Sequence, residues 1–204
     1  MAGKRCTPQF DISDIMTHKI AFRKGFDRDV QNVTEYSQAI HIRPARMQKG
    51  GAAMFIRIEK ARRTLCVWNG CQKVFSCRVG LGRAPQGPKR REGDGRTPEG
   101  VYRVCLVKEA GKYGRSLGLS YPGAQDAQLA HARGDIDSAT LANILAAHAQ
   151  NKRPPWGSPL GGEIYLHEGG SQADWTQGCI ALDEADMDIL FPLRDRIERV
   201  EIVP

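Results

Sequence analysis

The sequence predicts a mainly β domain with a few peripheral helices. Short apolar runs of strand length recur from Met54 onward, and turns rich in glycine and proline separate them. With 204 residues, of which 41% are hydrophobic, the chain is long enough for one well-buried core and short for two. The runs expected to form strands are 55–59, 64–68, 71–79, 101–108 and 163–167.

Residues 1–51 are expected to form a polar N-terminal extension that is partly disordered or loosely docked, and residues 52–204 form the domain. The extension is rich in Gln, Arg and Asp without sustained hydrophobic periodicity, and Gly50-Gly51 marks its boundary. No run of about 18 apolar residues predicts a transmembrane segment. Residues 1–25 contain no apolar stretch that ends in a small-residue cleavage site, so no signal peptide is visible.

The expected strands over 64–68 and 71–79 are predicted to form a β-hairpin. Asn69-Gly70 lies between two apolar runs and predicts a two-residue type I′ turn. This register sets Trp68 opposite Cys71 and Cys66 opposite Lys73, so the two cysteines are not cross-strand partners. The segment 83–100 that follows the hairpin contains three prolines and several glycines, a composition typical of a structured surface loop.

Two helices are expected in the C-terminal half. Asp137 or Ser138 can cap a helix over 139–150, whose apolar positions recur at helical spacing. His148 lies on that apolar face and is expected to be a packing or surface residue.

The second helix is expected over 184–190. Asp183 can cap it, its acidic residues favour the first turn through the helix dipole, and Pro192 follows its end. A closing strand is expected over 200–203.

The chemistry of the chain is indicated by His167, which stands twelve positions before Cys179 at the end of an apolar strand. A histidine beside a cysteine takes the thiol proton, and the resulting ion pair lowers the cysteine pKa below its usual value of about 8.5. The thiolate then attacks a peptide carbonyl to form a thioester. Gly178 lets the backbone approach the substrate, so the amides around Gly178 and Cys179 are expected to face the oxyanion. This pattern predicts acyl transfer with Cys179 as nucleophile and His167 as general base.

Three blocks of the sequence, in the right order, resemble the L,D-transpeptidase catalytic domain family (the YkuD or ErfK/YbiS family). Block 56–70 is similar to the family's opening β-hairpin. Block 79–102 is similar to its Gly-Pro-Lys, Glu-Gly-Asp and Thr-Pro-x-Gly-x-Tyr signature, and block 167–182 to its motif of a histidine before a Ser/Thr-x-Gly-Cys turn. The resemblance covers residues 54–204 and implies a β-sandwich or barrel-like sheet domain with a few peripheral helices.

The resemblance implies a peptidoglycan L,D-transpeptidase that needs no cofactor and no metal. Its donor would be a tetrapeptide stem, cleaved with release of the terminal D-Ala, and the amine of another stem would resolve the thioester. Water as acceptor would make the protein an L,D-carboxypeptidase, and a lysine of an envelope protein or a free D-amino acid are further acceptors. The resemblance also implies that the backbone carbonyl of Glu168 orients His167, and that the protein acts in the cell envelope or periplasm.

The chain departs from the family pattern in two places. Gln177 stands where many members carry a second histidine, and Ala181 stands where they carry a polar side chain. The segment between His167 and Thr176 is also shorter than usual, so we expect a more open cleft.

Five residues are candidates for substrate contact. Thr176 either braces the turn or touches the substrate, and Trp175 either packs in the core or forms a wall of the cleft. Gln177 lies in the nucleophile turn. Arg96 either binds a stem-peptide carboxylate bidentately or is solvated, and Tyr121 belongs to a Tyr-Pro segment that resembles part of the family's substrate cleft.

The net charge of +7 is unevenly distributed along the chain. Residues 57–116 hold fifteen Lys or Arg and five Asp or Glu, a net +10, whereas residues 117–204 hold six and thirteen, a net −7. The basic half either attracts an anionic polymer or is simply solvated. No nucleic-acid-binding motif accompanies it, so we expect peptidoglycan stem peptides rather than nucleic acid as partners. A non-catalytic cell-wall-binding module is the alternative from another class.

The number of cysteines does not decide whether the protein resides in an oxidising or a reducing compartment. In an exported protein several should pair, yet the nucleophile must remain a thiol, which leaves an odd number. No Cys-x-x-Cys or comparable His/Cys pair predicts a metal site. This count favours a reducing compartment or little periplasmic oxidation, and the pairing of the other five stays open. The six are Cys6, Cys66, Cys71, Cys77, Cys105 and Cys179.

Overall fold

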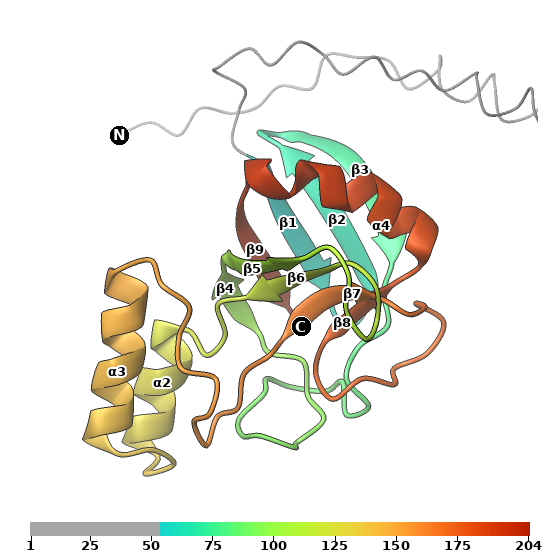
Figure 1. Ribbon diagram of the computed structural model, residues 1–204. Coiled ribbons are helices and arrows are strands. Elements are labelled where there is room, and N and C mark those ends of the chain that lie inside the picture. The colour runs from blue at the N-terminus through green and yellow to red at the C-terminus, as the bar shows by residue number, and fades with distance from the viewer. Residues whose placement is uncertain (1–53) are drawn as a thin grey trace, which may run out of the picture. The chain divides into compact units, whose positions relative to one another are not determined.

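The computed structural model describes residues 54–204 as two mixed β-sheets with a few helices (Figure 1). The predicted extension over 1–51 lies outside the described residues. The first sheet has the strand order β3-β2-β1-β9-β4 and the second the order β5-β6-β7-β8. The prediction of a mainly β domain is therefore confirmed.

The first sheet is built around a parallel pair of strands from opposite ends of the domain. β1 pairs in parallel with β9 and antiparallel with β2, while β4 is antiparallel to β9. Side chains of β1 alternate between buried and half-buried, as expected for a strand with one face on the core. The strands are β1 (Met54–Glu59), β2 (Thr64–Asn69), β3 (Gln72–Arg78), β4 (Gly100–Tyr102) and β9 (Ile197–Val203).

The second sheet carries the candidate catalytic residues. β6 is antiparallel to both β5 and β7, and β7 is parallel to β8. Buried residues of both sheets, such as Ile56 in β1 and Leu166 in β7, belong to one hydrophobic core, which fixes the second sheet on the first. The strands are β5 (Val104–Lys108), β6 (Ser116–Leu119), β7 (Tyr165–Glu168) and β8 (Ile180–Leu182).

The helices are α2 (Ala124–Ala132), α3 (Ser138–Ala149), α4 (Glu184–Leu190) and the 3-10 helix η2 (Phe191–Arg196). The expected cap of α3 is present, because Asp137 accepts a hydrogen bond from the Thr140 amide at 2.7 Å. Asp183 occupies the N-cap position of α4, but its side chain makes no capping hydrogen bond. α2 and α3 lie side by side (Figure 1). No helix in the described range combines the length and the apolar character needed to cross a bilayer.

The predicted register of the hairpin formed by β2 and β3 is wrong. Trp68 pairs with Lys73 and Cys66 pairs with Ser76, with a register shift between them. The turn begins one residue later than expected because Asn69 remains in the sheet, where it pairs with both Met54 and Gln72.

The single strand expected over 101–108 is also wrong. The segment divides at Arg103 into β4 and β5, which belong to different sheets. The Arg103 amide donates to Ser120 Oγ at 3.0 Å, and the Ser120 amide donates to the Arg103 carbonyl at 2.9 Å. These bonds hold the chain where it passes from one sheet to the other.

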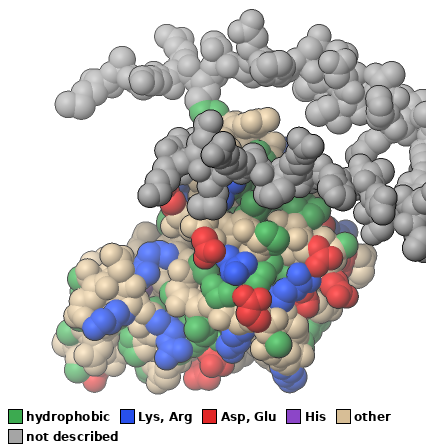
Figure 2. Space-filling view, turned by 45° about the horizontal axis from the view of Figure 1, so that its top comes forward, with side chains coloured by type: hydrophobic (Ala, Val, Ile, Leu, Met, Phe, Trp, Pro, Cys, Tyr) green, Lys and Arg blue, Asp and Glu red, His purple; other side chains and the backbone are tan. Residues whose placement is uncertain are grey.

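The uneven charge of the sequence is balanced in the fold. Ion pairs join the basic and the acidic halves, such as Arg63 with Asp174 at 2.8 Å and Arg115 with Asp188 at 2.7 Å. On the face shown in Figure 2, Lys and Arg side chains alternate with Asp and Glu. The fold therefore brings together charges of opposite sign that lie far apart in the sequence.

Candidate active site

The parallel pairing of β7 with β8 brings His167 and Cys179 to one cavity. His167 lies in β7 opposite Ala181 of β8, and Cys179 immediately precedes β8. Both side chains line a cavity of about 280 Å³, together with Tyr113 and Lys108. His167 is 3% exposed and Cys179 is half-buried.

The protonation state of His167 follows from its hydrogen bond. Nδ1 is hydrogen-bonded to the backbone carbonyl of Glu168, the atom to which the resemblance assigns the orienting role. A carbonyl only accepts, so Nδ1 carries the proton and Nε2 keeps its lone pair. Burial lowers the pKa of His167, against the opposing effect of the bond to Glu168. The imidazole is therefore neutral at pH 7, with Nε2 available to take a proton.

Two aromatic rings hold the imidazole in place. Tyr113 stacks on His167 with ring centroids 4.9 Å apart, and Trp175 meets the imidazole edge-on at 5.7 Å. The Trp175 indole donates to the carbonyl of Gly170 at 3.1 Å. Of its two possible roles, Trp175 thus takes a packing role directly beside His167. Tyr113 was missed by sequence reasoning, because a single tyrosine in a glycine-containing loop forms no pattern.

An ion pair fixes the loop that carries Tyr113. Arg115 donates to Glu168 at 2.5 Å and to Asp188 of α4 at 2.7 Å. Gly114 has φ +72°, and a Cβ there would lie 1.7 Å from a carboxylate oxygen of Glu168. Glycine is therefore required where the loop passes the carboxylate.

The Cys179 thiol is neutral in this structure. Its Sγ donates to the carbonyl of Glu163 at 3.3 Å. Burial raises the pKa of Cys179, while the Tyr165 amide and Lys89 act in the opposite direction. The lowered cysteine pKa expected from the sequence is therefore wrong for the unliganded protein, because desolvation outweighs these contacts.

The turn before Cys179 is held by a side-chain hydroxyl. Thr176 Oγ1 donates to the Cys179 carbonyl at 2.7 Å and accepts from the Gly178 amide at 3.1 Å. Thr176 therefore braces the turn and is 4% exposed. The expectation that the Gly178 amide faces an oxyanion is wrong in this geometry, because Thr176 already accepts its hydrogen. Gly178 is needed sterically, since a Cβ there would lie 2.5 Å from the carbonyl oxygen of Arg96.

Cys179 also borders a second cavity. This cavity has a volume of about 520 Å³ and is lined by Lys89, Trp156, Glu163 and Gln177 in addition to Cys179. Cys179 thus lines both the 520 Å³ cavity and the 280 Å³ cavity, and so does Glu163. Gln177 is exposed in the second cavity, where it can meet a substrate.

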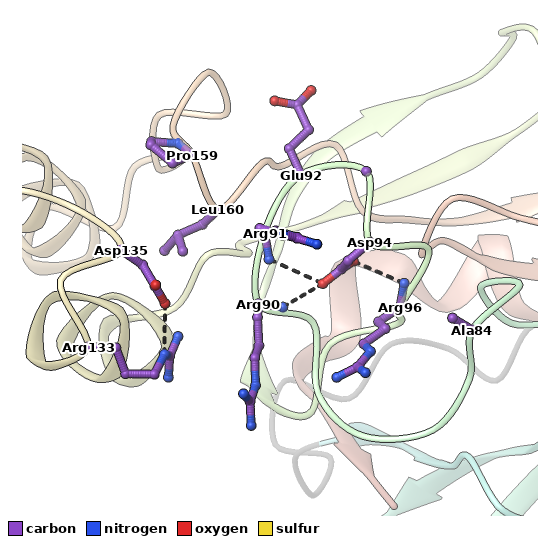
Figure 3. A pocket seen from close by; sticks show the side chains of 11 residues that line it. Ala84, Arg90, Arg91, Glu92, Asp94, Arg96, Arg133, Asp135, Pro159 and Leu160 are labelled. Atoms are coloured by element: carbon purple, nitrogen blue, oxygen red, sulfur yellow. Dashed lines mark hydrogen bonds and ion pairs between the residues drawn. The ribbon is translucent and has the colours of Figure 1, made fainter.

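Two further candidates do not line either of the cavities that Cys179 borders. Tyr121 is 0% exposed and its hydroxyl donates to the Leu160 carbonyl at 3.1 Å, so the prediction that it contacts substrate is wrong. Arg96 lines a separate cavity, which other arginines share (Figure 3). Within residues 54–204, no three His, Cys, Asp or Glu side chains are grouped so as to hold a metal ion.

The fold and the site define a class of protein, a mainly β domain with a thiol and an imidazole on the wall of one cavity. The family model of the L,D-transpeptidase catalytic domain (YkuD) matches residues 53–202. The chain therefore belongs to this family, which confirms the resemblance seen in the three sequence blocks.

Two solved structures share the fold of this chain at low sequence identity. Pgp2 from Campylobacter jejuni, a helical cell shape determining protein, is 20% identical with a TM-score of 0.52, over 74% of this chain and 47% of that chain. A mutant of Pgp2 is 20% identical with a TM-score of 0.54, over 76% and 48%. An L,D-transpeptidase from Xylanimonas cellulosilytica is 13% identical with a TM-score of 0.45, over 76% and 63%. The chain thus spans about half the length of the Pgp2 structures. The comparison with curated proteins gives no match.

Proposed function

We propose that this protein is a peptidoglycan L,D-transpeptidase that acts through a thioester on Cys179. The observation that carries the proposal is the shared cavity of Cys179 and His167, with Nδ1 of the imidazole occupied by Glu168 and Nε2 left to accept a proton. The donor is a tetrapeptide stem, and the acceptor is an amine of a second stem or a lysine of an envelope protein. No cofactor takes part.

The proton moves from sulfur to His167 as the sulfur attacks. Both groups are neutral before substrate binds, because burial raises the thiol pKa and lowers the imidazole pKa. The sulfur forms a bond to the carbonyl carbon of the diamino acid, the bond to D-Ala breaks, and the proton on Nε2 passes to the departing amine. The second amine then attacks the thioester and releases the thiol.

The backbone amide of Cys179 is the oxyanion donor in this proposal. The neighbouring Gly178 amide is bound to Thr176, so the Cys179 amide remains beside the attacking sulfur. A single donor of this kind contributes about 10²–10³ to kcat in comparable sites. The cavities on the two sides of Cys179 hold the donor and the acceptor.

Hydrolysis of the same thioester, an L,D-carboxypeptidase activity, is a second candidate. The lining of the two cavities beside Cys179 includes none of the described residues 168–176. Part of this short segment is instead bound to the N-cap of α4, where Ser171 donates to Asp183 from its amide at 2.8 Å and from its hydroxyl at 3.0 Å. Water therefore has access to the thioester from the side that this segment leaves uncovered.

In the decisive experiment, the protein is incubated with a disaccharide tetrapeptide, with and without an amine acceptor. The masses of the products and of the intact protein are then measured by mass spectrometry. We expect an acyl-enzyme on Cys179, release of D-Ala, and a cross-linked product when the amine is present. Cys179→Ser and His167→Ala should abolish acylation. Cys66→Ser, which changes another free thiol, is the matched control and should act as the wild type.

Each outcome separates the candidates. D-Ala release with no amine adduct would favour the carboxypeptidase, and binding of the peptide with no acylation would favour a cell-wall-binding module. Because peptidoglycan lies outside the cytoplasmic membrane, the proposed activity places the protein in the cell envelope. Fractionation of cells that produce the protein tests this location.

A further inference from the structure

A third cavity, of about 880 Å³, adjoins the cavity that Gln177 and Cys179 line, since Glu92 and Gly93 border both. We call it the arginine cavity. Its volume falls in the range of about 300–1,000 Å³ typical of sites for organic ligands and exceeds what a single ion needs. Four arginines line it: Arg90, Arg91, Arg96 and Arg133 (Figure 3).

Of the three acidic residues that line the arginine cavity, Asp94 and Asp135 are engaged with other groups, and Glu92 forms no ion pair within residues 54–204. Asp94 accepts from the buried Lys89 ammonium at 2.8 Å and from the backbone amides of Arg90 at 2.7 Å and Arg96 at 3.0 Å. Asp135 pairs with Arg133 at 2.7 Å. None of these carboxylates neutralises the guanidinium groups of the loop arginines.

The loop arginines are therefore uncompensated within the described part of the chain. No carboxylate of residues 54–204 forms an ion pair with Arg90, Arg91 or Arg96. In Figure 3 the Arg90 and Arg96 side chains point toward the bottom of the view, whereas Glu92 points toward the top, away from them. Guanidinium groups without partners in a cavity favour an anionic ligand.

The donors that remain match a carboxylate. Phosphate sites commonly use a set of free backbone amides, but here the amides of Arg90, Arg91 and Arg96 are bound to Asp94. The guanidinium forks of these arginines fit a planar carboxylate with two parallel hydrogen bonds.

We propose that the arginine cavity binds carboxylates of the stem-peptide substrate on the Gln177 side of Cys179. This inference rests on the proposed function for its substrate class. An extended tetrapeptide spans about 13 Å, enough to reach from one cavity into the next. The arginines thus select acidic stem peptides over stems whose carboxylates are amidated.

The test measures peptide binding without turnover. In a Cys179→Ala background, the dissociation constant of a disaccharide tetrapeptide with free carboxylates is compared with that of its amidated form by calorimetry. The double variant Arg90→Gln/Arg96→Gln should weaken binding of the acidic peptide by about tenfold or more and leave the amidated peptide within about twofold. Arg62→Gln, at a side chain 78% exposed and outside the cavity, is the control that removes one arginine elsewhere, and it should change neither constant.

Two results would overturn the inference: equal losses for acidic and amidated peptides in the double variant, or wild-type affinity for the acidic peptide. Competition by millimolar inorganic phosphate that depends on the arginines, with no preference between the peptides, would also overturn it and assign a phosphate site. Turnover by the chain with Cys179 intact is measured separately. Its absence would refute the proposed function and leave the binding result to decide the inference.

Discussion

Replacement of Thr176 by valine removes the hydroxyl that holds the turn before Cys179. Valine has the same shape, so no cavity forms, but the buried Gly178 amide loses its acceptor and the Cys179 carbonyl loses a donor. An unpaired buried amide costs about 1–3 kcal/mol, and the second bond contributes about 0.5–1.5 kcal/mol. We therefore expect the free energy of unfolding to fall by about 2–4 kcal/mol, a large share of the 5–15 kcal/mol or so typical of a domain.

Urea unfolding followed by tryptophan fluorescence measures this loss. With a slope of about 2 kcal/mol per molar urea, the midpoint should fall by about 1–2 M. Thr176→Ser keeps both hydrogen bonds, loses only a methyl group and should cost about 1 kcal/mol. If the valine and serine variants unfold at the same urea concentration, the hydroxyl does not hold the turn and the reasoning is refuted.

Four further outcomes are expected. Burial raises the Cys179 pKa, so alkylation of this residue by iodoacetamide should accelerate with pH beyond about 8.5; a plateau near neutral pH would reveal a thiolate instead. Burial lowers the His167 pKa, so the unfolded chain binds the proton more tightly and stability should fall as pH drops below about 6.5; His167→Gln should flatten this dependence. Tyr113→Ala removes the ring stacked on His167 and should lower kcat by up to about tenfold, whereas Tyr113→Phe retains it; equal rates would deny the ring a positioning role. Gly178→Ala sets a Cβ 2.5 Å from the Arg96 carbonyl and should sharply lower the yield of folded protein, a prediction that a wild-type melting temperature would contradict.

Much of the secondary structure could be predicted because its signals are local. The alternation of apolar residues in β1 follows from one face on the core, and the cap at Asp137 needs only the amide three residues later. Both β1 and α3 could therefore be predicted from short segments of the sequence.

Elements defined by distant partners were not visible. The apolar run over 101–108 looks continuous, yet β4 pairs with β9 and β5 pairs with β6. α2 was missed because its buried residues are alanines, Ala127 and Ala130, which produce almost no amphipathic contrast. Its helical state depends on packing against α3 and Leu160 in a small separate core.

By itself, the sequence determined the mainly β class, the family and the two side chains on which the proposed chemistry depends. A histidine and a Gly-Cys turn at this spacing can be recognised from the sequence alone. The tertiary structure alone decided which groups surround them. The fold stacks Tyr113 on the imidazole of His167 and hydrogen-bonds the Gly178 amide to Thr176. It also buries Tyr121 and places Arg96 in the lining of a separate cavity. The physical reason is that pKa values and free hydrogen-bond donors depend on burial and on neighbours contributed by distant segments, which no short stretch of sequence contains.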